Sequence, residues 1–127
     1  MAVAAALQAE LQSTVESLRE IQAETQKHHR ARQQFQQQQH ENEMVLKELE
    51  LLDDDAKVYK QIGPALVHQD HLEATSNVSK RLEFIGVEMK RIDEKLAILE
   101  EKARKKQVTM EKLQEEAQRM QAGAAAS

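Results

Sequence analysis

Two histidine pairs and a run of three aspartates are the residues of this chain whose spacing could support metal chemistry. The histidine pairs are His28-His29 and His68-x-x-His71, and the aspartates occupy positions 53–55. The sequence contains no cysteine, and no suitably spaced set of carboxylates completes a four-ligand site around either pair. The aspartate run lacks the alternating ligands and central glycine of a calcium loop. We therefore expect no metal or other cofactor, and we interpret the aspartates as a solvated helix terminus.

Catalytic, nucleic-acid-binding and membrane functions are equally poorly supported. No nucleophile–base pair, phosphate-binding glycine loop or perturbed acid pair is evident, so an enzyme is not expected. The net charge of −4 gives no electrostatic reason to expect nucleic acid. No segment approaches the roughly 18 consecutive apolar residues of a membrane span, and the apolar N-terminus lacks the basic start of a signal peptide. A soluble protein of the cytoplasm, without nucleic acid or membrane partners, is the expectation.

The composition predicts long helices in place of a compact core. Aromatic residues make up 2% of the 127 residues and charged residues 31%. Aromatic side chains normally dominate core burial, whereas a composition rich in Ala, Glu, Lys, Leu and Arg is typical of coiled coils.

Apolar residues recur with heptad spacing in both halves of the chain, and this spacing keeps one stripe of each helix facing a partner. The first seam comprises Leu7, Leu11, Thr14, Leu18, Ile21, Thr25, His28, Arg32, Phe35, Gln39, Asn42, Leu46 and Leu49. The second comprises Val78, Leu82, Ile85, Met89, Ile92, Leu96, Leu99, Ala103, Lys106, Met110, Leu113, Ala117 and Met120. Folding the chain at its midpoint sets Leu49 opposite Val78 and Leu7 opposite Met120. The pattern predicts an intramolecular antiparallel coiled coil.

The first seam is polar at six positions, whereas the second is polar only at Lys106. Polar seam residues cost stability and fix the register. Two interpretations follow for the middle of the coil. It is either loose, with accessible apolar surface, or a solvated coil whose long polar side chains extend outward to water.

A short β-rich segment, KVYKQIGPALVHQ, interrupts the helical pattern at the midpoint. Gly63 can take the positive φ of a type II′ turn, and Pro64 fits the next position, so the segment is predicted to form a β-hairpin. Pairing across this turn places Ile62, Ala65 and Val67 on one face and Tyr59 and Leu66 on the other. Because an isolated two-stranded hairpin is marginal in water and its edges remain unpaired, we interpret it as an assembly element. The alternative is a monomer whose hairpin folds down over the coil end.

The predicted architecture is mainly α, a long antiparallel two-helix coiled coil with one central β-hairpin. A single domain spans 1–127, with helix one over 3–52, the hairpin over 57–69, helix two over 71–122 and a frayed tail over 123–127. Asp70 and Glu73 resemble a capping box at the start of helix two.

This plan resembles the β-type subunits of the prefoldin family. The resemblance is most specific between Glu41 and Ile85, where the elements KELELL, VYK-x-IGP-x-LV and N-x-x-KRLE-[FY]-I occur. It implies a hetero-hexamer of two α-type and four β-type prefoldin subunits, whose hairpins join into a double β-barrel. It also implies ATP-independent binding of unfolded proteins such as actin and tubulin, and delivery of these clients to the cytosolic chaperonin.

The resemblance assigns roles to two sets of residues. The assembly hairpin would comprise Val58, Tyr59, Ile62, Gly63, Pro64, Leu66 and Val67. The client-binding tips would comprise Val3, Leu7, Leu11, Met110, Leu113 and Met120. Methionine suits surfaces that adapt to many partners, although these apolar residues could equally close the coil end. A coiled-coil tether or scaffold subunit without chaperone activity is the competing functional class.

Overall fold

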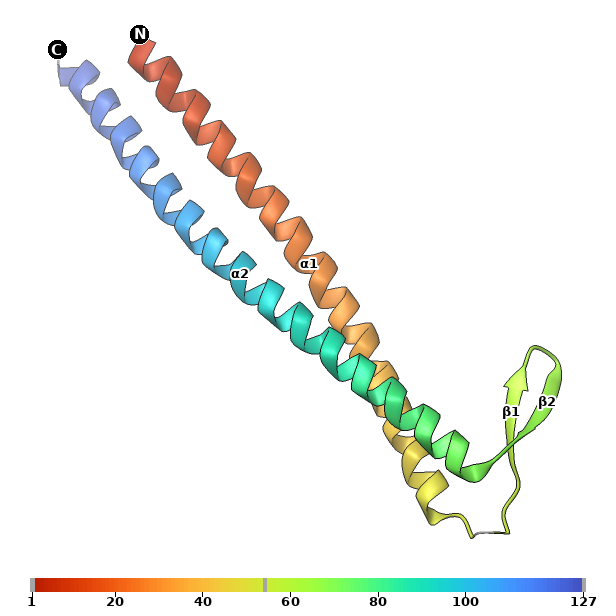
Figure 1. The fold of residues 1–127 in the computed structure, drawn as a ribbon. Helices are drawn as coiled ribbons and strands as arrows, with labels where there is room; N and C mark the ends of the chain where they lie inside the picture. The colour runs from red at the N-terminus through yellow and green to blue at the C-terminus, as the bar shows by residue number, and fades with distance from the viewer. Residues whose placement is uncertain (1, 54, 127) are drawn as a thin grey trace. The chain divides into compact units, whose positions relative to one another are not determined.

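Two long helices joined by one β-hairpin make up the structure, a computed structural model that describes residues 2–53 and 55–126. Helix α1 runs over Ala2–Leu51, strand β1 over Val58–Ile62, strand β2 over Ala65–Gln69 and helix α2 over His71–Ala126 (Figure 1). The strands form an antiparallel two-stranded sheet. The predicted fold class, helix–hairpin–helix, is confirmed.

The chain divides into two compact units. The terminal unit contains residues 1–30 and 93–127, and the hairpin unit contains residues 31–92. Each unit therefore holds a segment of both helices, and the hairpin unit also holds the sheet.

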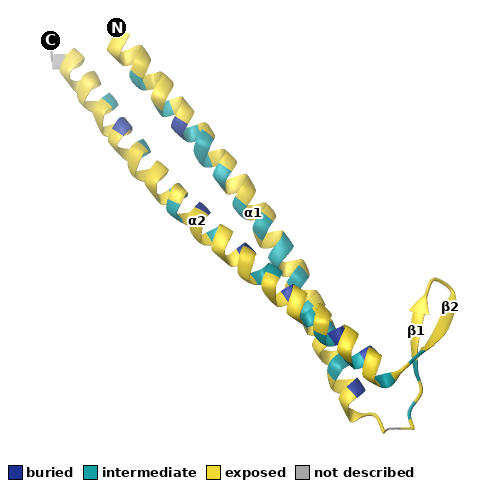
Figure 2. Ribbon diagram, viewed as in Figure 1, coloured by how far each residue is buried: buried dark blue, intermediate teal, exposed yellow. Residues whose placement is uncertain are grey.

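The predicted seams coincide with the buried stripes of both helices (Figure 2). All seam positions of α1 are buried or half-buried, and those of α2 are too, except Lys106 and Met120, which are exposed. At the base of the hairpin unit, Leu49 and Val78 lie in one buried cluster, as the register predicted. This cluster also contains Ala74, which the heptad count left outside the seam.

Three of the six polar seam residues of α1 form side-chain hydrogen bonds to carbonyl groups of their own helix. The Thr14 hydroxyl, at a buried position, donates to the carbonyl oxygen of Glu10 at 2.9 Å. Thr25 donates to the Ile21 carbonyl in the same way, and the Asn42 amide donates to the Gln38 carbonyl. Short polar side chains in a helix readily form this i−4 hydrogen bond. These groups therefore occupy the seam without needing a partner on α2.

The boundaries of α2 differ from prediction only at its C-terminal end. Asp70 caps the first turn, because its carboxylate accepts a hydrogen bond from the Glu73 N–H at 3.4 Å. The helix continues through Gly123 to Ala126, although a frayed tail was expected over 123–127. Alanine has the highest helix propensity, and three consecutive alanines follow Gly123. Ser127, and Asp54 in the aspartate run, lie outside the described residues.

A two-residue turn closes the hairpin, because Ile62 pairs directly with Ala65. Gly63 has φ of 59°, whereas proline at the next position is restricted to negative φ. This combination identifies the predicted type II′ turn. An added Cβ at Gly63 would meet no atom within 4 Å, so its backbone conformation, and not crowding, requires glycine.

Two glycine substitutions distinguish the strain of positive φ in the turn from the effect of glycine on helix propensity. Gly63→Ala should destabilise the hairpin by about 1 kcal/mol, because L-residues are strained at positive φ. Gly86→Ala, in open space on α2, should stabilise the full-length chain by about 0.5–1 kcal/mol through helix propensity. Urea unfolding followed at 222 nm measures the helices, and amide hydrogen exchange of residues 58–69 measures the hairpin. Equal hairpin protection in Gly63→Ala and the unsubstituted chain would contradict the turn assignment.

Candidate functional site

The register of the hairpin sorts its side chains onto two faces. Val58 pairs with Gln69, Lys60 with Val67, and Ile62 with Ala65 on one face. Tyr59 pairs with His68, and Gln61 with Leu66, on the other face. The predicted division of apolar residues between the faces is confirmed. Both faces carry aliphatic or aromatic groups, so neither face is entirely polar.

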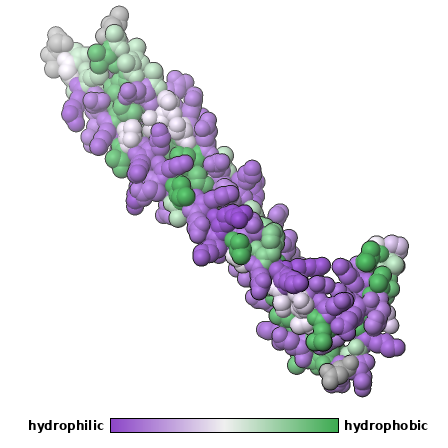
Figure 3. All heavy atoms as spheres, in the orientation of Figure 1, coloured by the Kyte–Doolittle hydropathy of each residue, from purple (hydrophilic) through white to green (hydrophobic). Residues whose placement is uncertain are grey.

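Most apolar side chains of the hairpin are exposed within the single chain. The exposed fraction is 52% for Tyr59, 56% for Ile62, 69% for Leu66 and 47% for Val67. Figure 2 shows both strands almost entirely in the colour of exposed residues, and Figure 3 shows hydrophobic atoms at the hairpin surface. The coil end does not cover these residues, and this stretch of the chain presents an apolar surface to solvent.

The root of the hairpin is anchored to the coil. Val58 is half-buried and packs against the buried cluster of Leu49, Ala74 and Val78. Val58, one of the predicted assembly residues, thus packs against the helices of its own chain and attaches the hairpin to them. Gly63 and Pro64 form the turn, and the four others display the exposed apolar groups.

A side chain at the start of α2 also holds the end of α1. The His71 Nε2 atom lies 2.5 Å from the carbonyl oxygen of Leu49, a hydrogen-bond contact in which the ring nitrogen donates. The last four carbonyl groups of a helix lack a regular intrahelical donor. Within the described residues, the Leu49 carbonyl, in that turn of α1, otherwise accepts only the Leu52 N–H at 3.4 Å. The sequence analysis considered His71 only as a metal ligand and missed this bond.

Phe35 and Phe84 make a second contact that sequence reasoning missed. Their rings lie edge to face with centroids 6.5 Å apart, an arrangement that aromatic pairs favour. The predicted register set Phe35 opposite Ile92 and placed Phe84 outside the seam. A phenyl ring reaches beyond one layer of a coil, and the chain's two phenylalanines were the only signal for this pair.

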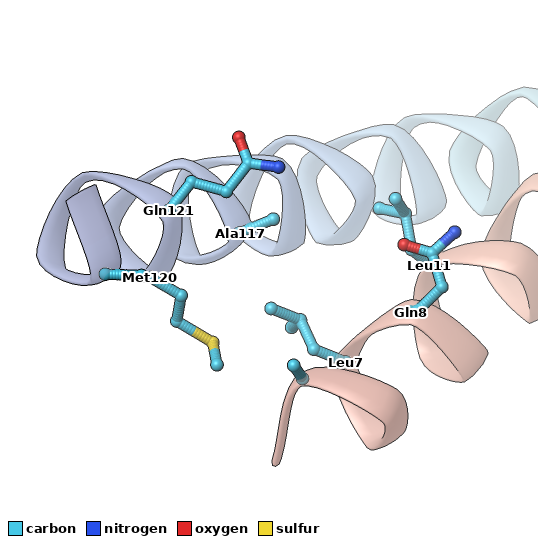
Figure 4. A pocket seen from close by; sticks show the side chains of 8 residues that line it. Leu7, Gln8, Leu11, Ala117, Met120 and Gln121 are labelled. Atoms are coloured by element: carbon cyan, nitrogen blue, oxygen red, sulfur yellow. The ribbon is translucent and has the colours of Figure 1, made fainter. Parts of the chain in front are cut away.

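The predicted tip residues belong to the terminal unit and differ in exposure. Leu7, Leu11, Ala117 and Met120 line a pocket of about 350 Å³ between the ends of α1 and α2. Figure 4 shows Leu7 and Met120 pointing into the space between the helices. Small alanine side chains such as Ala117 leave this space unfilled.

The remaining tip residues range from buried to fully accessible. Leu113 is buried and Met110 half-buried, whereas Val3 is 70% exposed and Met120 37% exposed. The ends of the helices therefore combine residues that close the coil with residues that face solvent.

The described residues contain neither a cluster of metal ligands nor a membrane-spanning helix. Within 2–53 and 55–126, no three His, Asp or Glu side chains gather into a group that could hold a metal ion. No helix in these ranges is sufficiently long and apolar to cross a membrane.

Comparisons with known proteins agree on one family. The family model described as prefoldin subunit matches residues 7–124. Prefoldin subunit 6 of Arabidopsis thaliana is 49% identical over 119 residues, covering 94% of this chain and 92% of the relative. Prefoldin subunit 6 of Homo sapiens is 40% identical with the same coverage. The crystal structure of the prefoldin beta subunit from Thermococcus strain KS-1 superposes with a TM-score of 0.76 at 24% identity, covering 81% of this chain and 90% of that chain.

The hydrogen bond between His71 and Leu49 gives a stability prediction. His71→Ala removes the side-chain donor to the Leu49 carbonyl, which keeps the Leu52 N–H at 3.4 Å, and should lower the free energy of unfolding by about 1 kcal/mol. His40→Ala, at an exposed position of α1, is the matched control and should change it by less than about 0.5 kcal/mol. Urea titration of both full-length variants measures the difference. Equal effects of the two substitutions would show that the bond adds no stability.

Proposed function

The chain belongs to the prefoldin family of chaperone subunits, and from this premise we propose that it is one β-type subunit of a hetero-hexameric chaperone. In this proposal the hairpins of two α-type and four β-type subunits join into a double β-barrel. The complex binds unfolded proteins such as actin and tubulin in the cytoplasm and delivers them to the cytosolic chaperonin. It hydrolyses no ATP, and its subunits are not enzymes.

The exposure of the hairpin's apolar side chains is the observation that carries this proposal. A two-stranded ribbon is marginally stable alone, and its outer edges offer unpaired backbone groups to another strand. Burying an aliphatic side chain such as Leu66 or Ile62 stabilises an assembly by about 1 kcal/mol or more. Pairing with neighbouring hairpins would satisfy the backbone and bury the side chains in one step.

Client binding is proposed for the exposed residues of the terminal unit. Val3 and Met120 are accessible, and Met120 borders a pocket with Leu7 and Leu11 that is mainly lined by apolar groups. Methionine adapts its shape to different partners. One such patch is small, so several subunits in one complex would supply the necessary avidity. Leu113, which is buried, would support the coil beneath the client surface.

Assembly can be tested with substitutions that spare the hairpin root. Ile62→Asp combined with Leu66→Asp places one charge on each exposed apolar face, and desolvating these charges in a barrel is unfavourable. We expect the variant to be absent from the hexamer in native mass spectrometry, with its helical circular dichroism retained. Gln33→Asp combined with Lys90→Asp, at exposed positions of α1 and α2 away from the hairpin, is the control and should assemble. Normal incorporation of the double variant would refute the barrel role, and a monomer or simple dimer of the unsubstituted chain with its sister subunits would favour a tether.

The client role can be tested without disturbing the coil. Val3→Asp combined with Met120→Asp should weaken capture of denatured actin by the hexamer by about fivefold, corresponding to about 1 kcal/mol of lost apolar burial. Ala5→Asp with Gln118→Asp adds the same charges at exposed positions that do not line the pocket. Suppression of actin aggregation is the measurement. Identical suppression by the two double variants would remove Val3 and Met120 from the client surface.

A further inference from the structure

A small cleft lies in the hairpin unit between the root of the hairpin and the first turns of α2. It has a volume of about 170 Å³. Its lining is apolar at Leu49, Val58 and Val78 and basic at Lys60 and Arg81, and none of its lining residues is an aspartate or glutamate. We call it the basic cleft. It therefore combines an apolar floor with two positive charges.

Neither positive charge has an acidic partner among the residues that the structure describes. Among residues 2–53 and 55–126, no side-chain hydrogen bond or ion pair involves Lys60 or Arg81. The helix neighbours of Arg81 three and four positions away are Asn77, Val78, Phe84 and Ile85, which carry no charge. The arginines at positions 91, 104 and 119 each pair instead with a glutamate three or four positions earlier.

The hairpin offers Lys60 no acid either. Its cross-strand partner is Val67, and its neighbours on the same face of β1 are Val58 and Ile62. Opposite charges in these positions are what would stabilise a strand pair. Both cations thus remain available to a ligand from outside the chain.

We propose that the basic cleft receives an acidic peptide segment, bearing one aliphatic side chain, from a neighbouring subunit of the assembly. The inference rests on the proposed function, because only a hexamer brings a neighbour to the hairpin. The carboxylate pairs with Arg81, whose planar guanidinium forms two parallel hydrogen bonds with such a group. Lys60 adds a second charge contact, and the aliphatic side chain packs on Leu49 and Val78.

The dimensions of the cleft favour a single side chain over a larger ligand. A volume of 170 Å³ is close to that of a cavity of about 150 Å³, which holds one benzene ring. A helix, about 10 Å across, does not fit. The cleft is continuous with the exposed ribbon, since Val58 and Lys60 belong to β1 itself. A strand that pairs along β1 would bring its own flanking residues to the cleft.

The required chemistry is present at the base of this chain's own coil. Leu51 is 84% exposed and Leu52 40% exposed, and the exposed Asp53 follows them directly. A neighbouring subunit with a like segment after its first helix would supply the acidic and aliphatic groups without an additional domain.

Zero-length carbodiimide cross-linking of the reconstituted hexamer of full-length subunits tests the contact directly. The reagent joins a lysine amine to a carboxylate only when the two are in contact. Mass spectrometry should identify Lys60 linked to an aspartate or glutamate of a neighbouring subunit. An intact hexamer in which Lys57 forms links to neighbours but Lys60 forms none would overturn the proposal.

Charge reversal supplies the second test. Arg81→Glu should accelerate loss of the subunit from the hexamer by about tenfold, because the substitution places like charges together. Raising the salt concentration should reduce this difference. Arg91→Glu, on the same helix, removes an arginine that already has Glu88 as its partner and should change the rate less than twofold. Equal rates for the two variants would overturn the cleft proposal while leaving barrel assembly intact, whereas failure of the unsubstituted chain to form a hexamer would overturn the proposed function itself.

Discussion

The backbone of the two-stranded ribbon controls the behaviour of this chain, because half of its hydrogen-bonding groups point away from the partner strand. In a sheet of only two strands, each strand is an edge. The outer N–H and C=O groups of residues 58–62 and 65–69 need water or another strand. The same residues carry apolar groups on both faces, and water does not satisfy those. A neighbouring strand meets both requirements, so the ribbon favours association over isolation.

The hairpin unit and the terminal unit differ in the size of the side chains that fill the space between their helix segments. At the base of the hairpin unit, Leu49, Ala74 and Val78 fill the interior, and His71 ties the start of α2 to the end of α1. In the terminal unit, small side chains such as Ala103 and Ala117 occupy seam positions. Open grooves of about 620 Å³ and 350 Å³ lie beside these residues. The small side chains therefore leave space along the seam that larger residues would fill.

Periodicity in the sequence was sufficient to predict the helices, the hairpin, its register and the buried stripe of each helix. These features depend on residues near in sequence or on a pattern that repeats over many turns. In addition, Gly63 indicates the position of the hairpin turn, and Asp70 indicates the start of α2. Contacts at the base of the coil were not predictable in this way. The position of His71 relative to Leu49 depends on the path of the intervening loop, and the Phe35–Phe84 contact depends on how far a ring extends along the groove. The cleft with Lys60 and Arg81 appears only when the strand and helix are placed side by side.

The i−4 hydrogen bonds of Thr14, Thr25 and Asn42 have a mechanical consequence. Each of these polar groups keeps its partner whether or not α2 is present, because donor and acceptor belong to the same helix. Separating the two helices would therefore break apolar contacts but strand no buried hydroxyl or amide, and unsatisfied polar groups are the costly ones. At these three layers, opening the coil would thus cost apolar burial and leave the hydrogen bonds of α1 intact.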